Sequence, residues 1–505
     1  MIWQSRRDFM CNVAVLAGSA SVPSIGRASA VTQDEALLNL SAVQAVAAMR
    51  RGDITAERYA TALLARCEAL KALNAFITLD RDKVLEAARK ADQRRAAGDN
   101  LGALHGLPIP IKDSINTKDL PTTSATAALR NFTPKSDAEV VQTLYQQGAL
   151  PLGKTNLHEM SFWWTSANSA FGPVHNPYDP KRVPGGSSGG TAVAIATRMA
   201  PVGLAEDTNG SIRVPAAFCG IVGFRPTTLR WPQAGVMPLT PAYDTVGPHS
   251  RSVADAILLD SVVTGSSPPA QPANLTGIRI GISRSYFFAG LDSEVEKVSA
   301  DVLKKLQDAG VELVEADIPN LAELAEKGNY PIIHQESVPN INAYLERYDA
   351  PATLDMILAQ ATPEMRQAME WFIMPGGKYR APYDAYVAAR NTYRPALQNT
   401  FRRYFRENNL AAIVFPATMC AATPMEDVWE VEVNGQKVPS YIAWARNITP
   451  GSCAGIPGLV LPGGLTGGGL PVGIEFDGPV GKDRELLALG LALEKILGPI
   501  QPPPV

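Results

Sequence analysis

The chain is poor in the residues that build metal sites and disulfide frameworks. Its 505 residues include five cysteines and five histidines, and both kinds are scattered. No two cysteines stand at C-x-x-C spacing, which excludes a zinc ribbon and a thioredoxin-like motif. His158 precedes Glu159, but no second histidine follows four residues after it, as a helical zinc site requires. We therefore predict no metal ion, and we interpret the cysteines as buried, reduced side chains.

An excess of charge of one sign is also missing. The formal net charge is −3 and the isoelectric point is about 6.1. Binding to nucleic acid or to an anionic membrane calls for a basic face. Beyond residue 30, no apolar run is long enough to cross a bilayer. These absences predict no nucleic-acid partner and no stable membrane anchor.

The first thirty residues differ from the rest and predict export. Arg6 and Arg7 form a twin arginine, and a mildly apolar run covers residues 12–23. Ala28-Ser29-Ala30 then supplies a small-x-small cleavage site. This order indicates a signal peptide of the twin-arginine type over residues 1–30 and a periplasmic or secreted location. A plain N-terminal helix is the alternative interpretation.

Helical and strand-like patterns alternate through residues 31–505 without an internal repeat or a low-complexity linker. Apolar residues at helical spacing indicate helices, and short β-branched runs indicate strands. Helices are predicted at 39–99, 137–147, 191–199, 292–309 and 482–497, and strands at 109–111, 149–152, 278–282 and 411–415. This alternation predicts an α/β layer architecture.

Two further features bear on the domain organisation. The apolar runs 458–462 and 472–476 are expected to pair across the glycine turn at 467–469. Residues 320–408 are helical in pattern and rich in aromatic residues. We predict one domain over residues 31–505, with 320–408 as a helical cap over a cleft. The sequence does not reveal the oligomeric state, and a homodimer is left open.

The glycine-rich stretch 185–190 is the most conspicuous motif. It lacks a preceding strand and an acidic residue about 20 positions later, so it fails the test for a dinucleotide fold. It also lacks the Lys-Ser/Thr ending of a phosphate-binding loop, and no cofactor is implied. Ser188 formally centres a G-x-S-x-G motif, but no acid and histidine follow in a recognisable setting. A Ser–His–Asp enzyme is therefore a minor alternative.

Three segments together are much more specific. They are Gly-Leu-Pro-Ile-Pro-Ile-Lys-Asp at 106–113, Pro-Gly-Gly-Ser-Ser-Gly-Gly-Thr at 184–191 and Asp-Thr-Asn-Gly-Ser-Ile-Arg-Val-Pro at 207–215. The first places Lys112 at the end of an apolar strand, where loss of water lowers the pKa of an amine. A lysine that is neutral near pH 7 can act as a general base.

In these segments, the chain resembles the amidase-signature family, with a core signature region at about 105–235. The order and the spacing match, with Ser187 75 residues after Lys112 and Ser211 24 residues after Ser187. The resemblance covers the chain after residue 30, and its C-terminal part is similar to mandelamide and indoleacetamide hydrolases. It implies a large, mixed, twisted β-sheet covered by helices on both faces.

The resemblance also implies the catalytic roles. Ser211 would be the nucleophile, Ser187 would bridge on a cis peptide bond, and Lys112 would be the neutral base. Backbone N–H groups of Thr208, Asn209, Gly210 and Ser211 would form the oxyanion hole. Ser188, Asp207 and Arg213 would orient the loop through hydrogen bonds, although a structural ion pair and a turn serine are an equal alternative. The family has glycine where this chain has Asn209.

The substrate follows less directly. Phe162, Trp163, Trp164 and Cys453 are candidate substrate-binding residues, with core packing as the alternative. We predict hydrolysis of a small aryl-substituted primary amide to acid and ammonia through an acyl-enzyme. The alternatives are a tRNA-dependent amidotransferase A-type subunit, a peptide amidase or carbamate hydrolase of the same family, and a non-catalytic binding protein on this scaffold.

Overall fold

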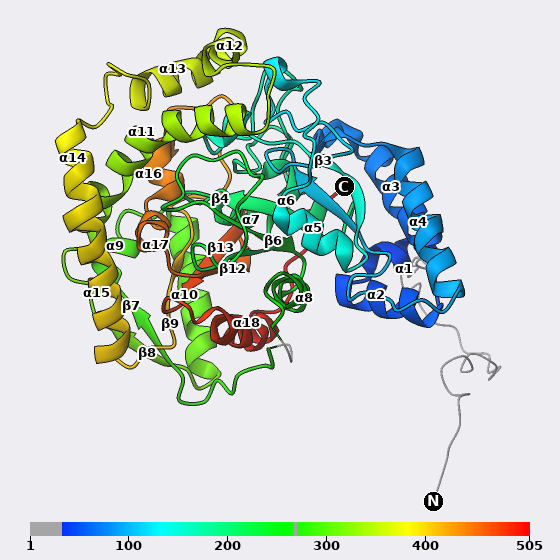
Figure 1. The fold of residues 1–505 in the computed structure, drawn as a ribbon. Helices are drawn as coiled ribbons and strands as arrows, with labels where there is room; N and C mark the ends of the chain where they lie inside the picture. Colours follow the sequence, from blue (N-terminus) through cyan, green and yellow to red (C-terminus); the bar gives the residue numbers. More distant parts are fainter. Residues whose placement is uncertain (1–32, 267–269) are drawn as a thin grey trace, which may run out of the picture.

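A computed structural model describes residues 33–266 and 270–505, and a mixed sheet of eleven strands forms its centre (Figure 1). The predicted signal at residues 1–30 lies outside the described residues. The strands lie in the order β1 (Phe76–Thr78), β3 (Leu150–Thr155), β2 (Pro108–Lys112), β4 (Val202–Asp207), β6 (Thr245–Ser250), β5 (Val222–Arg225), β12 (Gly458–Leu465), β13 (Pro471–Asp477), β9 (Ala412–Pro416), β7 (Arg279–Ile282) and β8 (Glu312–Glu315).

The sheet is parallel on both sides of its centre and antiparallel elsewhere. β2 pairs in parallel with β3 and β4, and β7 pairs in parallel with β8 and β9. β12 and β13 pair antiparallel, with Leu461 opposite Ile474, as the turn at 467–469 predicts. A separate hairpin joins β10 (Glu430–Val433) and β11 (Gln436–Pro439).

Helices cover both faces of this sheet, which confirms the predicted fold class. One face carries α6 (Gly189–Ala196) and α7 (Arg213–Cys219), and the other carries α8 (Val253–Thr264), α10 (Ser293–Asp308) and α18 (Asp483–Leu497). α7 lies very close to the strands because two glycines face it. A Cβ atom added at Gly473 would stand 2.5 Å from that of Ala217, and one added at Gly223 would stand 2.6 Å from that of Ala216. Any side chain at either glycine would push α7, and the loop before it, away from the sheet.

The N-terminal helices have recognisable ends. They are α1 (Gln33–Asn39), α2 (Ala42–Arg51), α3 (Ala56–Ala69) and α4 (Arg81–Ala96). Thr55 caps α3 by accepting a hydrogen bond from the N–H of Arg58, and Gly52 ends α2 with a φ of 80°. The predicted helical span 39–99 missed β1, because three residues are too few to show an alternating pattern.

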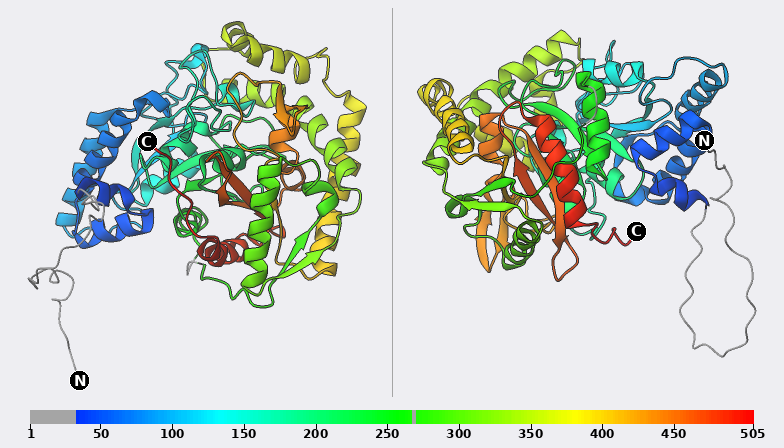
Figure 2. Two further views of the ribbon diagram at one scale, coloured as in Figure 1. Left: turned by 180° about the vertical axis from the view of Figure 1, so that it is seen from behind. Right: turned by 90° about the horizontal axis from the view of Figure 1, so that it is seen from below.

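Helices of the 320–408 region form a layer at the side of the sheet opposite α1–α4 (Figures 1 and 2). The region contains α11 (Leu321–Arg347), α12 (Leu354–Gln360), α13 (Pro363–Phe372), α14 (Tyr383–Ala388) and α15 (Arg394–Glu407). α11 packs against α15 and against α17 (Thr449–Ala454), which follows α16 (Ser440–Ala445). The remaining helices are α5 (Glu139–Gln146) and α9 (Arg284–Phe287).

Within residues 33–266 and 270–505, no helix combines the length and the hydropathy that crossing a bilayer requires. The same residues hold no group of three or more His, Cys, Asp or Glu side chains arranged for a metal ion. Cys67, Cys219, Cys420 and Cys453 are buried there, and none of them forms a disulfide.

Candidate active site

Lys112 is the last residue of β2, and the sheet topology brings it to the loops of the candidate site. β2 and β4 are parallel neighbours, with Ile111 beside Leu204, so their carboxyl ends lie at the same edge of the sheet. Lys112 is completely buried, and its Nζ lies 2.6 Å from Oγ of Ser187. Burial lowers the pKa of Lys112, and a neighbouring carboxylate opposes this only in part. An amine in this setting loses its proton more readily than a solvated lysine does.

The opposing carboxylate belongs to Glu206, which the sequence reasoning missed. Its Oε1 lies 2.6 Å from Nζ of Lys112, and the hydroxyl of Ser114 donates to the same oxygen at 3.3 Å. Glu206 lies on β4, whose six residues are all buried. Acidic residues are almost never fully buried without a partner. A glutamate directly before Asp207, at the end of the apolar run 202–205, was therefore a signal that could have revealed it.

Ser187 is held by the glycine-rich turn before α6. The peptide bond between Gly186 and Ser187 is cis, as the resemblance implies. A Cβ atom at Gly186 would stand 2.7 Å from the backbone carbon of Trp164, so only glycine fits against that chain. The Ser188 hydroxyl donates to the backbone oxygen of Glu206 at 3.2 Å. Ser188 thus fastens the turn to the end of β4 and keeps Ser187 beside Lys112.

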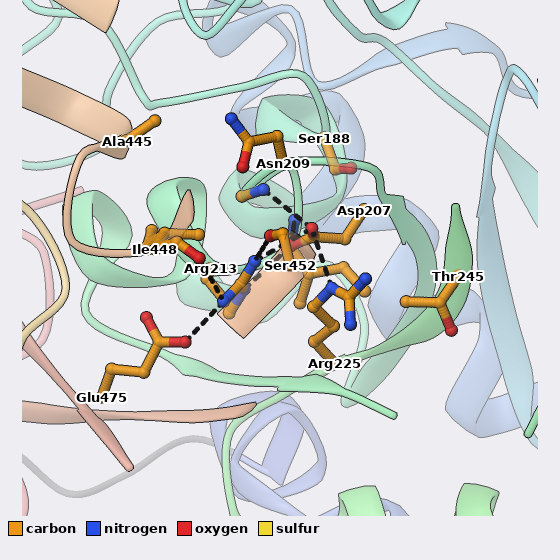
Figure 3. Close-up of polar contacts among 12 residues, drawn as sticks. Ser188, Asp207, Asn209, Arg213, Arg225, Thr245, Ala445, Ile448, Ser452 and Glu475 are labelled. Atoms are coloured by element: carbon orange, nitrogen blue, oxygen red, sulfur yellow. Dashed lines mark hydrogen bonds and ion pairs between the residues drawn. The ribbon is translucent and has the colours of Figure 1, made fainter. Parts of the chain in front are cut away.

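Ser211 lies on the loop between β4 and α7, and this loop wraps around the carboxylate of Asp207 (Figure 3). The N–H groups of Gly210 and Ile212 donate to Asp207 at 2.7 and 3.0 Å. Gly210 has a φ of 104°, a left-handed conformation that favours glycine. Within the described residues, the hydroxyl of Ser211 forms no hydrogen bond, and it lines a cavity. Ser211 therefore presents a free hydroxyl to a substrate in this cavity.

The predicted oxyanion hole needs one correction. The N–H of Gly210 is bound to Asp207 and cannot face a substrate oxygen. Among the described residues, the N–H groups of Thr208, Asn209 and Ser211 have no hydrogen-bond acceptor. Asn209 does not have a positive φ, so the left-handed position of this loop belongs to Gly210 alone. The carbonyl of Asn209 accepts a hydrogen bond from Nε1 of Trp164 at 3.0 Å, which ties the loop to the wall of the cavity.

Asp207 is the centre of a buried network of charges (Figure 3). Its two oxygens accept hydrogen bonds from Arg213 at 3.2 Å and from Arg225 at 3.3 Å. Arg213 also binds Glu475 at 2.6 Å and donates to the hydroxyl of Ser452. Burial by itself would raise the pKa of Asp207, but the two guanidinium groups outweigh it and hold this pKa well below its usual range. Asp207 and Arg213 therefore orient the loop from behind, without touching the cavity.

We expect Asp207→Asn to lower the free energy of unfolding by about 3–5 kcal/mol, because it leaves two buried guanidinium groups without their carboxylate. Since the folded-state pKa of Asp207 is depressed, its stabilising contribution is present above about pH 4 and is lost as the pH falls further. Urea unfolding followed by tryptophan fluorescence measures the loss. The matched control is Asp179→Asn, which breaks a partly exposed pair with Arg182 and should change stability by less than about 1 kcal/mol. Equal losses for both variants would contradict the role given to Asp207.

A cavity of about 770 Å³ opens beside Ser211. Phe162, Trp163 and Trp164, the candidate substrate-binding residues, all line it. Residues of the 320–408 region and of the C-terminal part of the chain supply the other walls. Further aromatic lining residues are Tyr286, Tyr330, Trp371, Phe372, Tyr379, Trp429 and Tyr441. Trp163 lies at the centre of this group, with ring centroids 5.3 Å from Trp164, 5.2 Å from Trp429 and 6.1 Å from Phe372.

Cys453 does not reach this cavity, which corrects its prediction as a substrate-binding residue. It is fully buried on α17, and its Sγ would stand 3.1 Å from a Cβ added at Gly328 of α11. The hydroxyl of Tyr243 lies 3.7 Å from the same sulfur. Burial raises the pKa of the Cys453 thiol to about 12, so it is a packed, neutral side chain. The chain forms α17 there, and this helix packs Cys453 against α11.

The fold and the site define an α/β amide hydrolase. A sequence model of the amidase family matches residues 58–487. The chain therefore belongs to the amidase-signature family, as its three segments predict, and it is an amidase.

Its relatives bear out the resemblance over nearly the whole chain. It is 40% identical over 458 residues to an indoleacetamide hydrolase of Agrobacterium vitis, a match covering 90% of this chain and 97% of the relative. It is 35% identical over 479 residues to a mandelamide hydrolase of Pseudomonas putida, covering 92% and 93%. Among solved structures, a crystal structure of an amidase superposes with a TM-score of 0.81 at 30% identity, covering 91% of this chain and all of the other.

Proposed function

We propose that this amidase hydrolyses a small aryl-substituted primary amide to a carboxylic acid and ammonia. The observation that carries the proposal is the cavity walled by aromatic rings on which Ser211 opens. Aromatic walls bind an aryl group by dispersion and by offset or edge-to-face contacts. A volume of about 770 Å³ suits a small ligand. The names of the two relatives, indoleacetamide hydrolase and mandelamide hydrolase, both specify primary amides that carry an aromatic ring.

The chemistry is a proton relay in which Ser211 is the nucleophile. The neutral amine of Lys112 takes the proton of Ser187, and Ser187 takes the proton of Ser211 as its Oγ attacks the amide carbon. The same route returns the proton to the nitrogen when the C–N bond breaks, and ammonia leaves. Water then attacks the acyl-enzyme and releases the acid. The 2.6 Å contact of Lys112 with Ser187 and the unengaged hydroxyl of Ser211 support this order.

The free N–H groups of the loop support the same step. The tetrahedral intermediate carries a negative oxygen, which preorganised N–H donors stabilise. Thr208, Asn209 and Ser211 provide such donors, because Asp207 already holds the N–H groups of Gly210 and Ile212. We assign the oxyanion hole to those three residues.

An ammonia-release screen tests the substrate class. We expect kcat/KM for arylacetamides to exceed that for aliphatic primary amides by about 10- to 100-fold, the benefit of burying one ring. Trp163→Ala should reduce this ratio by removing the centre of the aromatic wall. Tyr383→Ala is the control, because this ring is 69% exposed and does not line the cavity. Ammonia release from amidated peptides but not from arylacetamides would overturn the substrate proposal, and carbamate cleavage alone would do the same.

The proposal also places the enzyme outside the cytoplasm, in the periplasm or the medium. Its support is the twin arginine at Arg6 and Arg7 followed by the Ala28-Ser29-Ala30 site. Cell fractionation tests this localisation, and retention of the full-length chain in the cytoplasm would contradict it.

A further inference from the structure

Glu206 occupies a position that the serine–serine–lysine relay does not itself require. Its carboxylate and the hydroxyl of Ser187 both lie 2.6 Å from Nζ of Lys112. The glutamate is 4% exposed and the lysine is completely buried. The amine that moves protons in the proposed relay therefore also touches a buried acid, and that acid must affect how tightly the amine holds its proton.

Burial and the carboxylate act on this amine in opposite directions. Burial destabilises the ammonium form of Lys112, whereas the adjacent carboxylate stabilises it. An opposite charge within about 4–6 Å shifts the pKa of a group by about 1–3 units. Glu206 lies 2.6 Å from Nζ of Lys112, so we expect its carboxylate to raise the pKa of this amine by an amount in that range.

The other charged and titratable groups around Lys112 are separated from Nζ or committed elsewhere. Asp207 of β4 binds Arg213 and Arg225. Asp244, before β6, accepts hydrogen bonds from Thr208, Leu239 and Thr240, and burial raises its pKa to about 7. Its charge can therefore vary near neutral pH, but it has no contact with Nζ.

Three further groups lie on the neighbouring elements. Burial lowers the pKa of His158, on the loop after β3, to about 3, and that of His249, on β6, to about 4. Both histidines are therefore neutral near pH 7. Asp113 follows Lys112 in the chain, but it is paired with Lys154 at 3.1 Å. Glu206 is thus the acid in direct contact with the amine.

We propose that Glu206 is a positioning residue that sets the pH above which Lys112 can act as a base. Its carboxylate holds the proton on the amine at low pH and fixes the amine beside Ser187. The inference rests on the proposed relay through Lys112, Ser187 and Ser211. It predicts that the acid limb of the pH profile reports the loss of the proton from Lys112, and that the charge of Glu206 sets the pH at which this limb lies.

The test is Glu206→Gln, followed by the pH dependence of kcat/KM, whose acid limb reports the base of the free enzyme. The amide oxygen of glutamine can still accept from Nζ, so the contact remains while the negative charge is removed. We expect the acid limb to move by about 1–3 pH units toward acid. Glu494→Gln is the matched control, because this carboxylate of α18 accepts a hydrogen bond from the N–H of Val253 and has no contact with Lys112. An unmoved acid limb in folded Glu206→Gln overturns the proposal.

A second variant, Glu206→Asp, tests the proposal if Glu206→Gln does not fold. Glu206→Asp keeps the charge but draws it away from Nζ, so the limb should move in the same direction by a smaller amount. An unmoved limb in folded Glu206→Asp would overturn the proposal equally.

A second readout separates this inference from the substrate proposal. The rate at which a fluorophosphonate labels Ser211 depends on the same base but needs no amide substrate. If the acid limb of labelling shifts as expected in Glu206→Gln but the wild type hydrolyses no arylacetamide, the substrate proposal fails and the role of Glu206 stands. If the wild type hydrolyses arylacetamides but the acid limbs of kcat/KM and of labelling are both unmoved in Glu206→Gln, the role of Glu206 fails and the substrate proposal stands.

Discussion

Ser211→Ala should lower kcat by about 10⁴- to 10⁶-fold and abolish labelling by a fluorophosphonate. The variant removes the attacking hydroxyl of the proposed relay and leaves the contact of Lys112 with Ser187 in place. The variant should fold normally, since the Ser211 hydroxyl makes no hydrogen bond within the described residues. Ammonia release and intact-protein mass spectrometry measure the two effects.

Ser299→Ala is the matched control for Ser211→Ala. Ser299 is a buried serine on α10 whose hydroxyl donates to the carbonyl of Val295 at 2.7 Å, away from the cavity. We expect its kcat to be close to that of the wild type. Undiminished turnover in Ser211→Ala would remove the nucleophile assignment and the relay with it.

Lys112→Met should produce a loss of the same order as Ser211→Ala, because the two residues act as one unit. Methionine fills much of the space of the lysine side chain but cannot accept a proton from Ser187. Lys112→Arg should be equally inactive, since a guanidinium group is not deprotonated in proteins. The double variant with Ser211→Ala should be little worse than either single variant, which steady-state kinetics can verify.

Lys304→Met controls for a change of lysine to methionine. Lys304 is an exposed residue of α10 that pairs with Asp308 at 2.8 Å, so its replacement should leave kcat unchanged. Recovery of activity in Lys112→Arg would show that the site needs a positive charge at this position instead of a base. That result would contradict the relay.

Much of the fold was predictable from local patterns. The helix expected at 137–147 is α5 (Glu139–Gln146), and the expected strand pair at 458–462 and 472–476 lies within β12 and β13. Thr55 begins α3 through its hydroxyl, and Gly52 ends α2 in a left-handed conformation, as these residue types commonly do. These features depend on residues close in the chain, whose preferences for helix ends and turns can be recognised without any long-range contact.

The parts of the site that depend on distant contacts were not predictable in the same way. Glu206 is 94 residues from Lys112, and only the parallel pairing of β2 with β4 brings the two together. Cys453 was placed at the site on its neighbours in the sequence, but α11 separates it from the cavity. The N–H of Gly210 was assigned to a substrate oxygen, but the loop directs it to Asp207.

The sequence by itself determined the family and singled out Lys112, Ser187 and Ser211 as the proposed relay, because three segments match the family in order and spacing. Only the tertiary structure decided which charges surround the lysine, which N–H groups remain free and which rings line the cavity. The physical reason is that these properties depend on distances between segments far apart in the chain. Burial strengthens the electrostatic interactions across those distances, because the protein interior screens charges less than water does.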